Sequence, residues 1–224
     1  SPRLFKHMIY PNEKGRLTQK VINLEHLLKV TKQEPASVDT GFKFKVAHKL
    51  ATAVLQYHST PWLREDWRLK DLAYFGSPQA LSNESLRTLH LTFSFNHNDQ
   101  DQESVYSRRG IQASQDTTCF DMGSIYCHRG INNTVLFSLG VALLELAYHQ
   151  PLEKMSDAHD LIAAARKKAM SGYPLGRKYQ RIVQQCLQCD FGMGSDLNRT
   201  DLQSAVYGDV ICPLEEMINS LSLD

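Results

Sequence analysis

Residues 134–148 have the sequence TVLFSLGVALLELAY and form the most apolar stretch of this 224-residue chain. With 3.6 residues per turn, their apolar side chains point to all sides of a helix rather than to one face. Such a helix has to be surrounded by other parts of the same domain, because no side of it is suited to water. The sequence therefore predicts a buried central helix at 134–148.

The segments around this helix predict a mainly α (α+β) fold. Apolar residues three or four positions apart predict further helices at 17–30, 42–58, 157–171, 176–189 and 199–221. Pro61 should end the second of these and Pro213 should interrupt the last, because proline has no N–H to donate. Strand-like apolar stretches predict short strands at 4–10, 72–75 and 89–95.

Residues 96–118 are polar and contain almost no large aliphatic side chains. Such a segment cannot bury enough apolar area to offset the entropic cost of ordering its backbone. We therefore expect a mobile surface loop at 96–118 within a single domain that spans residues 1–224. Because the chain begins at Ser1 rather than at Met, we also expect that an N-terminal partner domain is missing from this sequence.

Composition excludes several classes of protein. A net charge of +1 argues against nucleic acid as a partner. No apolar run reaches the roughly 20 residues that a membrane span requires, so no membrane span is expected. The five cysteines are irregularly spaced and form no disulfide pattern, which favours an intracellular, cytoplasmic location.

Charge is distributed unevenly along the chain. Residues 1–70 carry 13 Lys/Arg against 6 Asp/Glu, whereas residues 193–224 carry one Arg against 6 acidic residues. This asymmetry could support contact with a protein partner or an intramolecular contact with the missing N-terminal domain. A solvated charged face explains the same pattern without any partner.

Two short motifs are weak candidates for chemistry. Asp190-Phe191-Gly192 spells the magnesium-binding motif of protein kinases, but it follows a predicted helix, where Gly192 is expected to end that helix in the left-handed conformation. Cys186 and Cys189 have the spacing of a zinc-binding pair, but no second pair of matching spacing is present. We predict no metal site and no cofactor.

One constellation resembles the C-terminal lobe of a protein kinase. Residues 50–59 (LATAVLQYHS) and 61–72 (PWLREDWRLKDL) resemble the helix before the kinase catalytic loop and that loop. Residues 137–146 (FSLGVALLEL) resemble the central helix of the lobe, and residues 182–199 resemble a later pair of helices. The three matches lie in the same order as in a kinase and cover most of residues 20–210.

The sequence resembles a fungal family of uncharacterised kinase-like domains more closely still. The similar motifs are HSTPWL at 58–63, the pattern Leu-Gly-x-x-Leu-Leu-Glu-Leu at 139–146, and the C-terminal segment between 205 and 215. In that family the domain often follows a helical, HeLo-like front domain. The resemblance thus implies a part in fungal signalling or in self/non-self recognition and cell death.

The resemblance also implies that the catalytic parts are degenerate. The kinase pattern His-Arg-Asp-Leu-x-x-x-Asn places Arg64, Glu65, Asp66 and Asp71 at the positions of its His, Arg, Asp and Asn. Only Asp66 remains as a possible base, and a loop-structuring role is the simpler interpretation. The Asp that anchors the central helix of a kinase falls on Val135, so that contact is expected to be absent.

We therefore expect a catalytically inactive, kinase-like interaction or regulatory domain. The alternative is the C-terminal lobe of an active or atypical kinase or phosphotransferase whose N-terminal lobe is absent. A third possibility is a purely structural domain. For the interaction domain, we predict a protein-binding face formed by Trp67, Arg64 and Arg68, with Trp67 exposed among charged neighbours and Trp62 equally compatible with core or surface.

Overall fold

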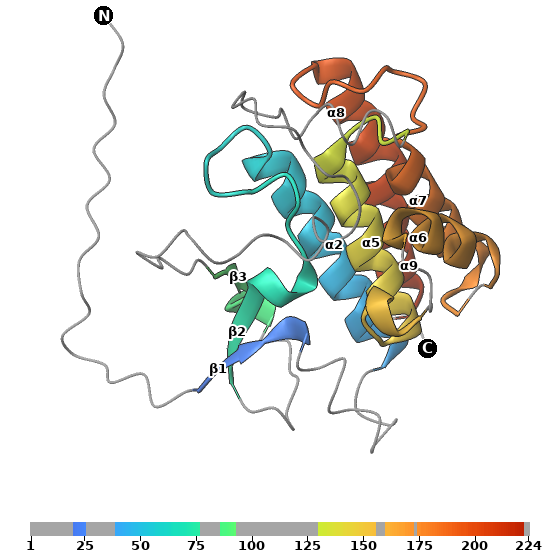
Figure 1. Cartoon of the computed structure of the whole chain (residues 1–224). Helices are drawn as coiled ribbons and strands as arrows, with labels where there is room; N and C mark the ends of the chain where they lie inside the picture. The colour runs from blue at the N-terminus through green and yellow to red at the C-terminus, as the bar shows by residue number, and fades with distance from the viewer. Residues whose placement is uncertain are drawn as a thin grey trace, which may run out of the picture.

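The computed structural model describes residues 20–25, 39–76, 86–92, 130–155, 160–172 and 174–221. It consists of a bundle of helices with a small sheet at one side (Figure 1). The elements are β1 (Lys20–Asn23), α2 (Thr40–Tyr57), β2 (Leu72–Gly76), β3 (His90–Leu91), α5 (Thr134–Tyr148), α6 (Leu161–Met170), α7 (Gly176–Gln188), α8 (Thr200–Val206) and α9 (Cys212–Ser220). The predicted mainly helical fold class with a few short strands is confirmed.

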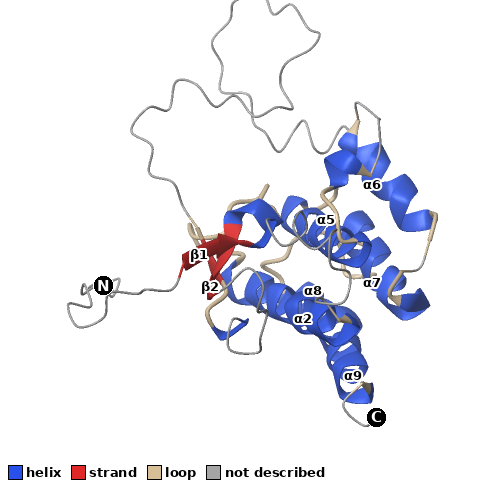
Figure 2. Ribbon diagram, turned by 90° about the horizontal axis from the view of Figure 1, so that it is seen from below, coloured by secondary structure: helices blue, strands red, loops and turns tan. Residues whose placement is uncertain are grey.

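The predicted central helix is α5. Asn133 caps its first turn, because its side-chain oxygen accepts a hydrogen bond from the Leu136 N–H at 2.8 Å. All residues from Val135 to Ala147 are buried, and in Figure 2 the helix lies between α6, α7 and α2. Gly140 allows α7 to approach closely, because a Cβ at this position would lie 2.8 Å from the Leu187 side chain. The absence of a side chain at residue 140 therefore sets how closely the two helices can pack.

The helix predicted at 42–58 is α2, and it packs along α5 and α9. Asp39 caps its start by accepting the Phe42 N–H at 2.9 Å. The Lys43 ammonium donates to the carbonyl of Ala147 at 3.4 Å, where a cation also suits the negative end of the α5 dipole. Burial lowers the pKa of Lys43. This contact fixes the start of α2 against the end of α5.

The sheet corrects one prediction. Residues 20–23 lie in the region that we expected to be helical (17–30), but they form β1, which pairs antiparallel with β2. Val21 is 52% exposed and its neighbour Ile22 is buried, as expected when side chains alternate across a strand. Spacing misled the prediction because it grouped the exposed Val21 with the buried Leu24, whereas the buried pair is Ile22 and Leu24, two positions apart.

The other predicted strands are only partly described. β2 (Leu72–Gly76) confirms the strand expected at 72–75, and it pairs antiparallel with β3. β3 covers His90–Leu91, while residues 93–95 lie outside the described residues. The strand predicted at 4–10 and the loop predicted at 96–118 also lie outside them.

The C-terminal helices follow the predicted order. A π-helical turn at Tyr207–Ile211 separates α8 from α9, and its closing bond runs from the Cys212 N–H to the carbonyl of Tyr207. Pro213 lies in the first turn of α9, so the change in the helical hydrogen-bond pattern comes directly before the residue that lacks an N–H. The predicted interruption of this region near Pro213 is therefore confirmed. None of the described helices is both long enough and apolar enough to cross a membrane.

The end of α7 differs from the prediction. Cys189, with a φ of 53°, is the left-handed residue that ends the helix, and the Asp190 N–H then bonds to the carbonyl of Gln185. Gly192 also has a positive φ but lies three residues later, in the following turn. The assignment of Gly192 as the helix-ending residue was therefore wrong.

Glu145 is a buried carboxyl group in the middle of the apolar helix α5. Its Oε1 accepts the N–H of Leu152 at 2.9 Å, which holds the chain that leaves α5. Burial raises the pKa of Glu145 to about 7; the charges of Glu153 and Glu25 also raise it, and the Leu152 hydrogen bond and Arg68 lower it. This carboxyl group therefore changes its charge near neutral pH.

Leu139→Asp tests the central position of α5. Leu139 is fully buried, so an aspartate there would be an unpaired charge in the core and should cost at least about 3 kcal/mol of unfolding free energy. Chemical denaturation measures this cost. Met193→Asp, at an exposed loop position, is the control and should change stability by less than about 0.5 kcal/mol. A stable Leu139→Asp variant would contradict a central α5.

Glu145→Gln tests the titration of the buried carboxyl group. Because the folded state raises its pKa, Glu145 favours folding most at low pH, and this contribution is lost as pH rises through about 7. The unfolding free energy of the natural protein minus that of Glu145→Gln should fall by roughly 3 kcal/mol between pH 4.5 and 8. Glutamine keeps a carbonyl acceptor for Leu152, so this difference isolates the charge. A difference independent of pH would refute the shifted pKa.

Candidate functional site

The candidate site is the connecting loop, residues 58–71, which joins α2 to β2. It contains the positions that we expected to correspond to a kinase catalytic loop. Its backbone folds into successive turns, with hydrogen bonds from Thr60 N–H to Tyr57, from Leu63 to Thr60, and from Asp71 to Arg68. The loop therefore has a defined shape that its own backbone helps to maintain.

Two hydroxyl groups of α5 fix this loop to the central helix. Thr134 donates to the Glu65 carboxylate at 3.1 Å, and Ser138 donates to the Glu65 carbonyl at 3.0 Å. We expected no anchor because Val135 replaces the kinase aspartate. Val135 is indeed buried among apolar residues, but Thr134 and Ser138, four positions apart on one face of the helix, provide a different anchor. That spacing is the sequence signal by which this contact could have been found.

Asp66 and Asp71, two of the three acidic residues at the predicted catalytic positions, have partners within the loop. The Arg64 guanidinium binds both oxygens of Asp66, from Nε to Oδ1 at 3.1 Å and from Nη2 to Oδ2 at 3.2 Å. Asp71 accepts the backbone N–H of Arg68 at 2.9 Å, and its carbonyl accepts both the N–H and the hydroxyl of Thr92. Both residues thus contribute to the shape of the loop and of the neighbouring strand.

Trp67 is in the core, which corrects our expectation of an exposed side chain. It is 3% exposed, and its indole N–H has no hydrogen-bond partner among the described residues. Leu63 and Leu69 are buried with it, so these three apolar side chains of the loop point inward while the charged ones lie between them. The charged neighbours misled the prediction because a loop segment can alternate between core and solvent.

The exposed aromatic residue of the loop is Trp62. Its side chain is 56% exposed, and Tyr57, at the end of α2, is exposed as well. Of the two arginines predicted to lie beside Trp67, Arg64 is exposed, whereas Arg68 is half-buried and its charge acts on the buried Glu145. The structure therefore separates the three residues predicted to form one binding face.

His58 connects the start of this loop to α8. Its Nδ1 lies 3.0 Å from the carbonyl of Leu55, and its Nε2 lies 3.4 Å from the amide nitrogen of Gln203. The same amide nitrogen donates to the carbonyl of Leu197 at 3.0 Å. Because a carbonyl only accepts and an amide NH₂ only donates, this network assigns the proton of neutral His58 to Nδ1. His58 thus has a structural role.

Candidate metal ligands are not gathered in the part of the chain that the structure describes, where no three His, Cys, Asp or Glu side chains form a group. Cys186 and Cys189 are buried free thiols. Burial raises the pKa of the Cys186 thiol and raises that of Cys189 to about 11. Both side chains are therefore protonated at neutral pH, which suits packing rather than metal binding.

Comparison with known proteins places the chain in a family without assigning an activity to it. No curated protein matches the sequence, and no solved structure matches it. The sequence profile of the family described as "Domain of unknown function (DUF7580)" matches residues 5–221. Since this match covers nearly the whole chain, the protein belongs to the DUF7580 family.

Proposed function

We propose that this domain is a catalytically inactive, kinase C-lobe-like module that binds a protein partner through the surface around the connecting loop. The observation that carries the proposal is the bidentate Arg64–Asp66 pair. In a kinase the corresponding aspartate has to accept a proton from the substrate. Here both carboxylate oxygens of Asp66 are bound by a neighbouring guanidinium, so the side chain is committed to the loop.

The kinase likeness is supported by the order of the elements and by one contact. The helix α2, the connecting loop, β2, the central helix α5 and the later helix α7 occur in the order expected for a kinase C-terminal lobe. The loop is also attached to the central helix, through Glu65. The replacement of the loop His, Arg and Asn by Arg64, Glu65 and Asp71 argues against phosphoryl transfer, because that reaction depends on correctly placed metal-binding and base groups.

The proposed binding surface is centred on Trp62, with Arg64 and Tyr57 beside it in sequence. Large aromatic side chains and arginine contribute most of the binding energy in many protein interfaces. The Arg64 side chain of the Arg64–Asp66 pair is 71% exposed, so a partner could contact it without breaking the pair. This surface replaces the one predicted around Trp67.

We further propose that the module regulates a fungal signalling or self/non-self recognition protein inside the cell. In such a protein its partner would include the helical front domain of the same chain. This part of the proposal rests on the resemblance of residues 58–63 and 139–146 to the fungal kinase-like domains.

Nucleotide binding tests the absence of phosphoryl-transfer machinery. We expect no change in the melting temperature with ATP and Mg²⁺, because the connecting loop offers no free carboxylate pair to hold the metal. Bound nucleotide at a hundred times its dissociation constant would add about 2.7 kcal/mol of stability. Stabilisation that disappears in Asp66→Asn would instead favour the alternative of an atypical phosphotransferase.

The two tryptophans allow the surface to be tested directly, because the chain contains no others. Trp67→Ala should cost about 3–5 kcal/mol of unfolding free energy, since it empties a buried site. Trp62→Ala should change stability by less than about 0.5 kcal/mol but weaken capture of the partner.

Trp67→Phe and Trp62→Phe leave one tryptophan each and provide a matched fluorescence test. Acrylamide should quench Trp62 far more than Trp67, and added front domain should protect Trp62. If Trp62→Ala binds the front domain as well as the natural protein does, the proposed surface is wrong.

A further inference from the structure

Two loops meet at the start of α5. The Thr134 hydroxyl donates to the Glu65 carboxylate of the connecting loop at 3.1 Å. The side-chain amide of Asn133 donates to the carbonyl of Ser195 at 2.9 Å, in the α7–α8 loop, residues 189–199. Figure 1 shows both loops at the end of the bundle where α8 lies. Because Asn133 and Thr134 are consecutive, the two loops lie side by side and form one two-loop surface.

Gln203 of α8 joins the same two loops a second time. Its amide nitrogen lies 3.4 Å from Nε2 of His58, the first residue of the connecting loop. The same nitrogen donates to the carbonyl of Leu197 in the α7–α8 loop at 3.0 Å. Each loop is thus held at two points, so a partner would not have to order them at an entropic cost.

Each of the two loops exposes one large apolar side chain. Trp62 of the connecting loop is 56% exposed, and Met193 of the α7–α8 loop is 48% exposed. Trp62 comes three residues before the anchored Glu65, and Met193 comes two residues before the anchored Ser195. An indole ring offers a large contact area, and a methionine side chain adapts to the shape of what it touches. The two-loop surface therefore suits an apolar face of a partner.

The two-loop surface has an excess of carboxylates. Its two arginines are already paired, Arg64 with Asp66 and Arg199 with Asp201, each at 3.1 Å. Three further acidic residues of the two loops are exposed: Glu65, Asp190 and Asp196. Within the part of the chain that the structure describes, no ion pair joins these three to a cation. Their charges are therefore available to a partner.

The other cations of the connecting loop lie away from the start of α5. Arg68 is half-buried, and its charge acts on Glu145, about three helical turns beyond Thr134 along α5. The backbone carbonyl of Lys70 accepts a hydrogen bond from the Asn23 side chain of β1, which places Lys70 at the sheet. The two-loop surface thus keeps a net negative charge, although the whole chain has a net charge of +1.

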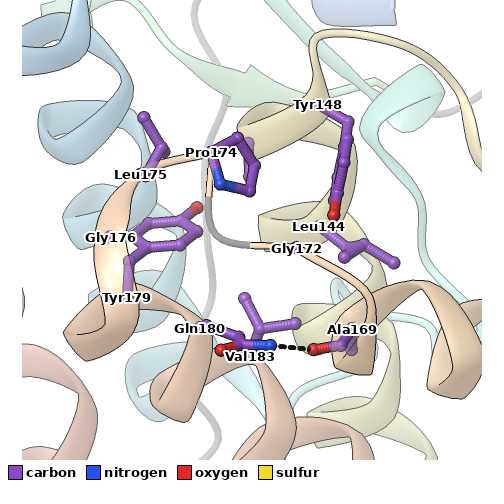
Figure 3. Close-up of a pocket in the computed structure, with 11 residues that line it drawn as sticks. Leu144, Tyr148, Ala169, Gly172, Pro174, Leu175, Gly176, Tyr179, Gln180 and Val183 are labelled. Atoms are coloured by element: carbon purple, nitrogen blue, oxygen red, sulfur yellow. Dashed lines mark hydrogen bonds between the residues drawn. The ribbon is translucent and has the colours of Figure 1, made fainter.

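A hollow at the opposite end of α5 does not offer a comparable site. Figure 3 shows the residues that line it, among them Leu144, Tyr148 and Tyr179. Its volume is about 10 Å³, which is close to the least that holds one water molecule. A partner side chain therefore cannot enter this hollow, and the exposed side chains of the two loops are the stronger basis for recognition.

We propose that the partner of the two-loop surface is a basic amphipathic segment. Its apolar face covers Trp62 and Met193, and its Lys and Arg side chains pair with the available carboxylates, which are Glu65, Asp190 and Asp196. This inference rests on the proposed function and adds the chemical class of the partner. Complementary charge steers such a segment to the surface and fixes its register, while the apolar contact holds it. The same carboxylates repel nucleic acid, anionic lipid and acidic protein segments.

NMR titration with defined peptides tests the charge of the partner. The probe is a blocked peptide of Leu and Lys, about four helical turns long, with all leucines on one helical face. The methyl signal of Met193 and the indole N–H signal of Trp62 should shift saturably, while the methyl signals of Leu144 and Val183 at the far end of α5 should not. A second peptide with Glu in place of Lys, and a third with the same composition but no apolar face, should each bind at least about tenfold more weakly.

A charge-neutralised variant and its matched control separate local from general electrostatics. Asp190→Asn/Asp196→Asn removes two charges and keeps the side-chain oxygen that accepts the Asn198 N–H. It should bind the basic peptide about fivefold or more weakly, and raising the salt concentration should weaken binding to the natural protein. Glu215→Gln/Glu216→Gln removes the same number of charges at exposed positions of α9 and should bind normally.

Two outcomes of the titrations would overturn the proposal. One is equal weakening of binding by both double variants, which would show only a general effect of net charge. The other is an acidic peptide that binds as tightly as the basic one.

Capture of the front domain separates this inference from the proposed function. If Trp62→Ala weakens capture and Asp190→Asn/Asp196→Asn does not, the surface around Trp62 stands and the basic partner is wrong. If Trp62→Ala has no effect on capture, the surface of the proposed function is itself wrong and the inference fails with it.

Discussion

The structure depends on the burial of α5 on all of its sides. No side of this helix can face water without a cost, so α2, α6 and α7 all have to pack around it. The lack of a side chain at Gly140 allows α7 to come close enough to do this. The C-terminal helix α9 packs on α2 and so takes its position indirectly from this arrangement.

The few polar groups of α5 attach the irregular segments to the core. Thr134 and Ser138 hold the connecting loop through Glu65, and Glu145 holds the chain that leaves the helix through the N–H of Leu152. Because a buried polar group without a partner is costly, the contacts of the buried Ser138 and Glu145 favour one position for each segment. The proposed binding surface at Trp62 therefore belongs to a loop that is attached to the central helix.

In the connecting loop, acidic side chains bind groups of the same loop. Both carboxylate oxygens of Asp66 bind the Arg64 guanidinium, and Asp71 accepts the backbone N–H of Arg68. Trp67, among charged neighbours in the sequence, fills the core instead of the surface. These contacts make the loop rigid, which suits a surface that presents Trp62 to a partner.

The sequence by itself determined the central helix, the order of the C-terminal helices and the break before Pro213, because apolar spacing and the missing N–H of proline act locally. It could not determine that residues 20–23 pair with β2, that Cys189 rather than Gly192 ends α7, or that Trp67 is buried and Trp62 exposed. The strand pairing and the burial depend on contacts with distant parts of the chain, which short-range spacing does not record. The attachment of the connecting loop to Thr134 and Ser138 likewise joins residues about 70 positions apart, so only the tertiary structure could show it.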